Sequence, residues 1–203
     1  MLFNALEYLR LYLDALIEIE FRNNGTIPIV LDNIGQALDG QSNNSDNSII
    51  LSLVNLEEEF TRKNQPPYRQ TDAAGRVSRT NPPVALNAFL LVAANIENYG
   101  TALEAIAQVV GCFQAKRNFT VSNTGLEISE SDLSFTAAEE RRFRLLVELY
   151  TLTFEQMNHL WGTLGGRQVP FVLYKVRMVE IDRQLVQSNG PLITTTQLNP
   201  GLS

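Results

Sequence analysis

Residues 143–181 read FRLLVELYTLTFEQMNHLWGTLGGRQVPFVLYKVRMVEI. Apolar and polar residues alternate at its two ends, 143–150 and 171–181, and a period of two is typical of β-strands with a buried face. Between these ends, apolar residues recur every three or four positions, which is the period of an amphipathic helix. The helical apolar residues are Met157, Leu160, Trp161 and Leu164. The stretch therefore predicts a strand, a helix and a second strand in succession.

Two short motifs mark the ends of the predicted helix. Thr153 and Gln156 form the T-x-x-Q pattern of a capping box, which satisfies free backbone N–H groups at a helix start. Gly165 and Gly166 follow the last apolar residue, and glycine tolerates the left-handed conformation that commonly ends a helix. The helix is therefore predicted to begin after Thr153 and to end before Gly165.

The length and composition of the chain limit its class. Its 203 residues suffice for one substantial core or at most two small domains. A net charge of -6 and a pI near 4.9 argue against a dedicated nucleic-acid or anionic-membrane partner. Cys112 is the single cysteine, which excludes an intrachain disulfide, and no signal peptide is recognised at the start. A reducing cytoplasm is therefore the expected place of synthesis and assembly.

Apolar periodicity assigns the rest of the chain to a mixture of helices and strands. Residues 2–21 carry a leucine stripe typical of a helix, which either packs within its own domain or contacts another subunit. A second helix is predicted over 99–114, and its apolar face holds Leu103, Ile106, Ala107, Val110 and Phe113. Further strands are predicted at 26–31, 48–56, 84–96 and 119–121, with a mobile loop at 35–47. This order predicts an α+β fold with a mixed, mostly antiparallel sheet flanked by helices.

A long polar connection between two predicted strands carries the one basic cluster of the chain. It covers residues 61–83, and Asp72 is its only acidic residue. Its basic residues are Arg62, Lys63, Arg69, Arg76 and Arg79. Loops of this length inside a compact domain are usually functional or disordered. Two interpretations stay open: a solvated hairpin arm with no specific partner, or an arm that docks on an acidic neighbour during assembly.

The periodicity fades after Asp182, which divides the chain into a domain over 1–185 and an extended C-terminal tail over 186–203. Within the tail, Leu192, Ile193, Thr194 and Thr195 favour an extended conformation that can pair with another sheet. Together with the basic arm, these residues are the candidate assembly contacts.

The residue types that usually perform catalysis are too few to predict an enzyme. His159 is the single histidine, and one histidine with one cysteine cannot build an ordinary zinc site. The glycines at 162, 165 and 166 end a helix, so they form no phosphate-binding loop. The acidic run Glu57-Glu58-Glu59 is interpreted as a solvated face. No catalytic residue, metal or cofactor is predicted.

The segment 152–182, LTFEQMNHLWGTLGGRQVPFVLYKVRMVEID, resembles the N-terminal domain of the cap, or tube-terminator, proteins of extracellular contractile injection systems of the antifeeding-prophage type. Three more segments follow the order of that family, at 48–60, 81–114 and 135–162. The resemblance covers about residues 1–182 and is carried by the Leu-Trp-Gly-x-Leu-Gly-Gly turn and the following Pro-x-Val-Leu-Tyr-x-Val-Arg segment.

This resemblance implies a fold like that of phage tail terminators and no catalytic activity. It implies a homohexameric ring at the baseplate-distal end of the particle, where it ends the inner tube and holds the last sheath layer. The implied partners are other copies of the chain, the inner-tube protein, the sheath protein and a second cap protein, with no nucleic acid and no membrane. The particle is expected to assemble in the bacterial cytoplasm. Alternatives are an adaptor ring beneath a separate cap protein and a stand-alone protein-binding module.

Overall fold

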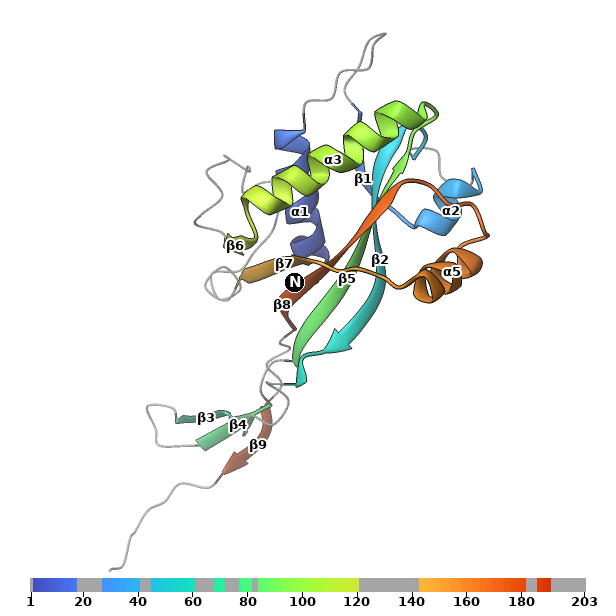
Figure 1. Cartoon of the computed structure of the whole chain (residues 1–203). Helices are drawn as coiled ribbons and strands as arrows, with labels where there is room; N and C mark the ends of the chain where they lie inside the picture. The colour runs from blue at the N-terminus through green and yellow to red at the C-terminus, as the bar shows by residue number, and fades with distance from the viewer. Residues whose placement is uncertain are drawn as a thin grey trace, which may run out of the picture.

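The structure is a computed structural model that describes residues 2–17, 27–40, 45–60, 68–71, 77–81, 84–120, 143–181 and 186–190. Its centre is a six-stranded sheet of order β1-β2-β5-β8-β7-β6 (Figure 1). The strands are β1 (Ile29–Leu31), β2 (Ser48–Glu58), β5 (Val84–Asn95), β6 (Asn118–Thr120), β7 (Arg144–Leu149) and β8 (Phe171–Ile181). β1 pairs with β2 in parallel, and the other neighbours are antiparallel. The prediction of a mixed, mostly antiparallel sheet is therefore confirmed.

Two pairs of helices pack on opposite faces of this sheet. α1 (Leu2–Leu16) and α3 (Tyr99–Ala115) share one core cluster with β8 residues Tyr174 and Val176. α2 (Ile34–Leu38) and α5 (Phe154–Thr163) share a second cluster with Leu173 of β8. The alternation predicted for β8 thus separates two buried faces, as expected for side chains that point to opposite sides of a strand.

The leucine stripe of α1 packs within the chain. Leu6, Leu9 and Leu13 are buried in the first cluster, whereas Leu16 at the end of the helix is exposed. On the outer side of α1, Arg10 forms an ion pair with Glu7 at 2.7 Å. Of the two interpretations of this helix, core packing is confirmed for the described part of it.

Residues 143–181 form β7, α5 and β8, as the sequence predicts. The Thr153 hydroxyl accepts a hydrogen bond from the Gln156 N–H at 3.2 Å, and the Gln156 side chain accepts one from the Thr153 N–H at 3.0 Å. Gly165 and Gly166 follow the helix with φ of 89° and 77°, a region that favours glycine. Trp161 is buried, so α5 is anchored on the sheet by its largest side chain.

The prediction of a loop over 35–47 was wrong at its start, because Ile34–Leu38 form the helix α2. Asn33 caps this helix by accepting a hydrogen bond from the Gly35 N–H at 3.0 Å. Ile34, Ala37 and Leu38 then bury one side against the sheet. Three apolar residues at helical spacing are enough for a single turn with a cap when a sheet is available to cover them.

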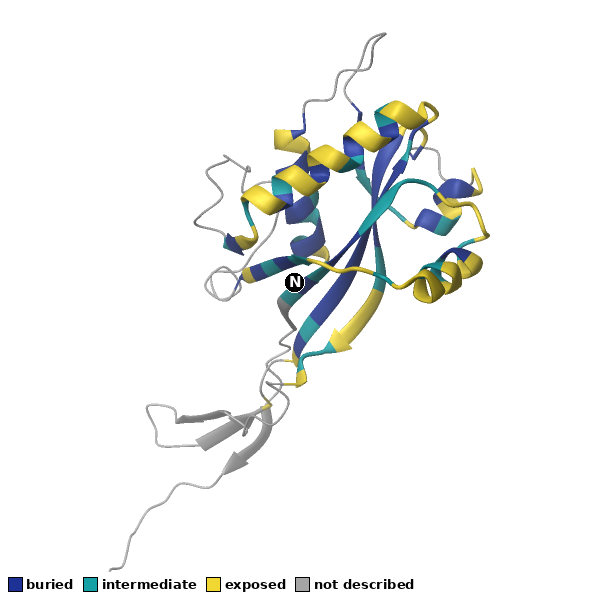
Figure 2. Cartoon of the chain, in the orientation of Figure 1, coloured by how far each residue is buried: buried dark blue, intermediate teal, exposed yellow. Residues whose placement is uncertain are grey.

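The helix α3 forms as predicted, but the apolar face predicted to be buried only partly matches the face that packs on the sheet. The residues that pack on the sheet are Ala102, Ala105, Val109 and Phe113. Of the predicted face, Leu103, Ala107 and Val110 are exposed, and Figure 2 shows this helix striped with buried and exposed residues. The small side chains of Ala102 and Ala105 allow a close approach of the helix to the sheet, which leaves the larger side chains outside.

A second, three-stranded sheet has the order β3-β4-β9, with β3 (Tyr68–Thr71), β4 (Val77–Thr80) and β9 (Val186–Gly190). It is built from the continuations of β2, β5 and β8, which leave the large sheet at the same end. In that region Val84 pairs with Ile181, and Glu58 pairs with Leu86. The small sheet therefore joins two parts of the chain. β3 and β4 come from the basic connection between β2 and β5, and β9 comes from the segment after β8.

Candidate assembly surfaces

The structure brings part of the predicted basic arm together with the start of the predicted tail. Arg69 of β3 and Arg79 of β4 are register partners, and β9 pairs with the other edge of β4. Arg62, Lys63 and Arg76 lie outside the described residues. So do the tail residues Leu192, Ile193, Thr194 and Thr195. The arm and the tail, which the sequence treats as separate candidates, thus share one small sheet over β4 and β9.

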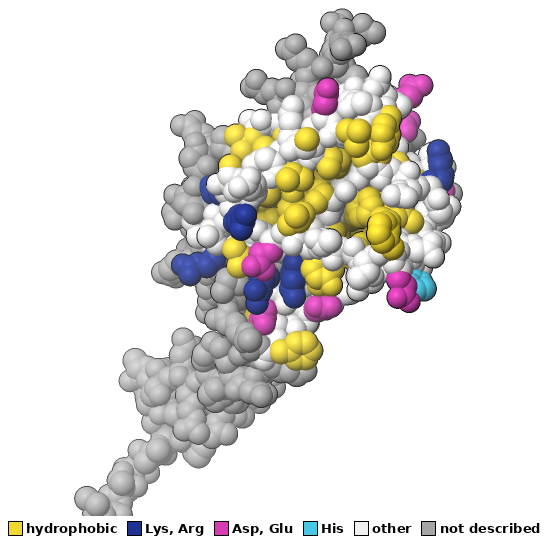
Figure 3. Space-filling view, viewed as in Figure 1, with side chains coloured by type: hydrophobic (Ala, Val, Ile, Leu, Met, Phe, Trp, Pro, Cys, Tyr) yellow, Lys and Arg dark blue, Asp and Glu magenta, His cyan; other side chains and the backbone are white. Residues whose placement is uncertain are grey.

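A larger candidate surface lies on the main body and was missed from the sequence. Exposed apolar side chains gather over α3 and over the segment from the end of β7 to the start of α5 (Figure 3). They are Tyr99, Leu103, Val110, Leu149, Tyr150 and Phe154. Below, these six residues are called the outer apolar face. Contiguous apolar surfaces of this kind on soluble proteins commonly mark sites of protein contact.

The outer apolar face follows from the sequence of α3. Tyr99, Leu103, Ala107 and Val110 recur at helical spacing and form a stripe turned away from the buried residues. Over 17 residues, α3 contains one charged residue, Glu104. A helix packed on one side and solvated on the other normally carries a charged outer stripe, so this composition was the available signal for an apolar outer surface on α3.

A hollow of about 380 Å³ opens within this face between α3 and strands β7 and β8. Val110, Leu149 and Tyr174 contribute to its apolar lining, and Arg117 and Glu148 are its charged residues. Burial raises the pKa of Tyr174 to about 12, so the phenol stays neutral at physiological pH. The hollow suits an apolar side chain of a protein partner better than a charged substrate.

A group of ion pairs links β8 of the large sheet to β7 on one side and to the end of β2, across β5, on the other. Arg177 of β8 lies 3.3 Å from the Glu59 carboxylate and 3.4 Å from that of Glu148, and Lys175 lies 3.9 Å from Glu57. The hydrogen bond to Glu59 raises the pKa of Arg177. The interpretation of the 57–59 run as a purely solvated face is therefore corrected, because Lys175 and Arg177 of β8 reach Glu57 and Glu59 across β5, which lies between β2 and β8 in the sheet.

A second group of exposed apolar side chains lies at the end of the large sheet where the small sheet begins. Leu56 of β2, Phe60 and Val84 of β5 are all exposed. The Glu59 N–H donates to the Ala85 carbonyl at 2.9 Å, which keeps the chain near Phe60 beside the start of β5. The main body thus carries two apolar patches of different composition.

The residues considered for chemistry do not come together. Cys112 lies on α3 and packs against the first core cluster, whereas His159 lies on α5 across the sheet and is largely exposed. Burial raises the pKa of the Cys112 thiol, which disfavours the reactive thiolate. Within the described ranges, no three His, Cys, Asp or Glu side chains form a group that could hold a metal ion. In the same part of the chain, the helices lack a stretch both long and apolar enough to span a membrane.

Comparison with known proteins gives a family match and similar solved structures. A family model described as the Pvc16 N-terminal domain matches residues 6–195. A solved sheath/tube terminator of an extracellular contractile injection system, PVC, in its extended state, is 15% identical with a TM-score of 0.56, over 100% of this chain and 65% of that chain. The tube-terminating cap of the anti-feeding prophage is 14% identical with a TM-score of 0.57, over 98% of this chain and 60% of that chain.

A search of curated proteins gives no match. The chain spans somewhat less than two thirds of the length of both solved neighbours. At these identities, the likeness establishes a shared fold, and the tail-terminator-like architecture expected from the sequence is confirmed.

Proposed function

Because the chain belongs to the Pvc16 N-terminal domain family, we propose that it is a structural subunit of the cap that ends the tube of a contractile injection system. In this proposal, copies of the chain form a homohexameric ring at the baseplate-distal end, stop growth of the inner tube and anchor the last sheath layer. Its partners are other copies, the inner-tube protein, the sheath protein and a second cap protein above the ring. The ring assembles in the cytoplasm and then remains part of the particle.

The observation that carries this proposal is the outer apolar face. A closed ring of identical subunits needs two different, mutually complementary patches on each subunit. The outer apolar face supplies one candidate patch, and Leu56, Phe60 and Val84 supply a second of different composition and position. Contacts of this kind would bury apolar side chains that are exposed in the single chain. Removing this apolar surface from water would make the free energy of association more favourable.

The proposed role involves no reaction. The hollow between α3 and strands β7 and β8 has Glu148 as its single acidic residue, and a groove lined by Leu31, Leu53 and Leu160 has Asp32 as its single acidic residue. General acid–base catalysis needs groups that meet at one partly desolvated position, and single acids on separate surfaces do not provide this. The geometry therefore supports a function through contact surfaces.

Deleting the gene in a producing strain tests this proposal. Electron microscopy of the resulting particles is expected to show overlong or ragged tubes, because nothing would then occupy the growing end. Restoring the intact gene on a plasmid should return a uniform length. Tubes of normal length that lack only the layer at the tip would contradict termination and indicate an adaptor role.

A further inference from the structure

The edge of the large sheet at β2 is only partly covered. β1 pairs with β2 from Ile49 to Leu51 and then turns away. The turn is fixed by hydrogen bonds from the Asp32 N–H to the Leu51 carbonyl at 3.0 Å and from the Ile34 N–H to the Ser52 hydroxyl at 3.3 Å. No described strand pairs with this side of β2 over 53–57, although its other side pairs with β5 along the same length.

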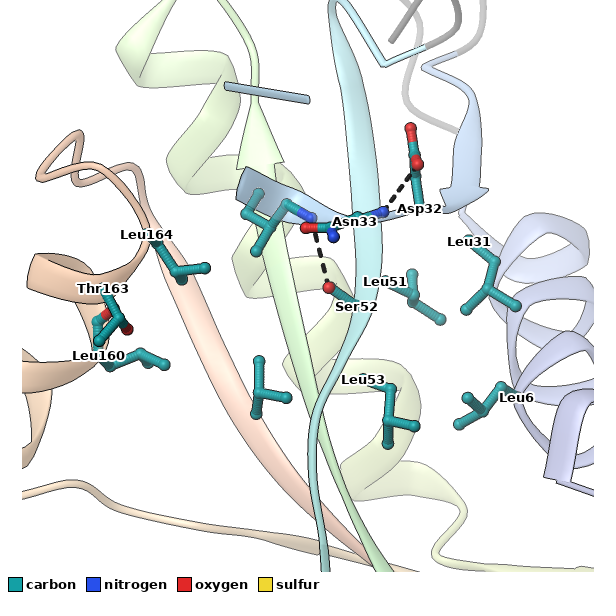
Figure 4. Close-up of a pocket in the computed structure, with 12 residues that line it drawn as sticks. Leu6, Leu31, Asp32, Asn33, Leu51, Ser52, Leu53, Leu160, Thr163 and Leu164 are labelled. Atoms are coloured by element: carbon teal, nitrogen blue, oxygen red, sulfur yellow. Dashed lines mark hydrogen bonds between the residues drawn. The ribbon is translucent and has the colours of Figure 1, made fainter. Parts of the chain in front are cut away.

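A groove of about 480 Å³ runs beside this edge (Figure 4). Leu6 of α1 and Leu31 line it on one side of β2, and Leu160 and Leu164 of α5 line it on the other (Figure 4). These residues border the two different core clusters, which the sheet separates elsewhere. A groove that reaches both clusters has to lie at an edge of the sheet, where a further strand would fit.

The lining of the groove favours an uncharged extended segment. Successive side chains of a strand point to opposite faces, so a strand added at this edge would place alternate side chains against Leu6 and against Leu160. The one charged residue of the lining, Asp32, already accepts hydrogen bonds from the Ser45 hydroxyl and the Asn33 N–H. An acidic side chain entering from a partner would lose water and meet the Asp32 carboxylate without gaining a counter-ion.

The C-terminal sequence of this chain has the required chemistry. No charged side chain occurs in residues 184–203. Residues 192–198, LITTTQL, lie between Pro191 and Pro200 and are rich in residues that favour strands. At about 3.3 Å per residue, this segment would extend about 23 Å, which is enough to cover the open edge of β2.

The direction of β9 favours the groove of another copy. β4 leads from Val77 to Thr80 toward the large sheet, and β9 runs the opposite way, from the partner of Thr80 to the partner of Val77. Gly190, the last residue of β9, pairs with Val77 at the end of β4 that is farther along the chain from β5. Residues 191–203 continue the sequence from that end of the small sheet. Fully extended, they reach about 40 Å.

We infer that residues 192–198 of one copy add a strand to the open β2 edge, over 53–57, of a second copy. The added strand supplies backbone hydrogen bonds at the edge and places leucine, isoleucine and threonine side chains in the groove on both faces. This strand exchange rests on the proposed function, because it requires copies of the chain to lie side by side in the ring. It would connect adjacent subunits through the segment that follows β9.

Hydrogen–deuterium exchange of the purified full chain tests this inference. Backbone amides of 53–57 are expected to exchange at least tenfold more slowly at high than at low protein concentration. A variant with Thr194→Pro and Thr195→Pro should lose this protection, because proline has no backbone N–H and the two substitutions remove this donor from two consecutive positions of the strand. The matched control with Thr194→Val and Thr195→Val should keep it, and a peptide of residues 190–203 should restore protection to the proline variant.

A second pair of variants approaches the contact from the groove. Leu160→Glu places a carboxylate in the lining and should abolish the protection, whereas Asn158→Glu on the exposed side of α5 should not. Protection that is independent of protein concentration would place the tail on its own chain and overturn the inference. Equal exchange in the wild type and the proline variant, or protection that arises only with added tube protein, would also overturn it. These readouts need no particle, so a failed deletion phenotype would leave them interpretable.

Discussion

Replacing Leu103 and Leu149 with glutamate is expected to weaken self-association of the purified chain about a thousandfold without unfolding it. The side chain of Leu103 is 48% exposed on α3 and that of Leu149 is 59% exposed at the end of β7, so neither is needed for the core. Each substitution would place a carboxylate in an apolar contact, at a cost of about 2 kcal/mol or more, and each 1.4 kcal/mol is about a tenfold change in affinity. Sedimentation over a range of concentrations measures the change.

The matched control for this variant is Gln108→Glu. Gln108 is exposed on α3, and at about 100° per residue it lies about 140° around the helix from Leu103. This control adds one negative charge to the helix that carries Leu103, but outside the outer apolar face, so association should remain close to that of the wild type. A wild-type chain that stays monomeric at all concentrations would contradict the proposed contact and favour a stand-alone binding module.

Replacing Phe119 with alanine is expected to lower the free energy of unfolding by about 3–5 kcal/mol. Phe119 is fully buried and joins three elements, since its ring lies 4.8 Å from that of Tyr12 on α1 and 6.1 Å from that of Phe113 on α3, centroid to centroid. Alanine would leave a cavity between β6 and both helices. Urea unfolding followed by circular dichroism gives the change.

A Phe119→Leu variant distinguishes the effect of the cavity that alanine leaves from the effect of replacing Phe119 at all. Leucine fills most of the volume, so this variant should lose clearly less stability than the alanine variant. Phe154→Ala provides an outer reference, because its side chain is 86% exposed and its removal should change stability by less than about 0.5 kcal/mol. A small effect of Phe119→Ala would contradict the packing of β6 against α1 and α3.

The parts of the fold that the sequence predicts are those fixed by local interactions. The capping box at Thr153 needs residues three positions apart, and the alternation in β8 needs only the strand itself and a sheet covered on both sides. Both appear within a short window of sequence. The prediction of α5 and β8 therefore did not depend on knowing the topology.

The outer apolar face could not be assigned in the same way. α3 has apolar residues on two sides, and size alone favours Leu103 and Val110 for the core over Ala102 and Ala105. The structure reverses this choice because the small residues allow the closest packing on the sheet. The pairing of β9 with β4 joins segments more than a hundred positions apart, so no local pattern predicts it.

The central claim is that this chain acts as a contact subunit at one end of a tube. The most direct measurement is electron microscopy of purified particles in which the chain carries a compact fused label at its N-terminus. Label density is expected in one ring at the end distal to the baseplate. Density along the whole tube, density at the baseplate, or particles without the label would contradict it.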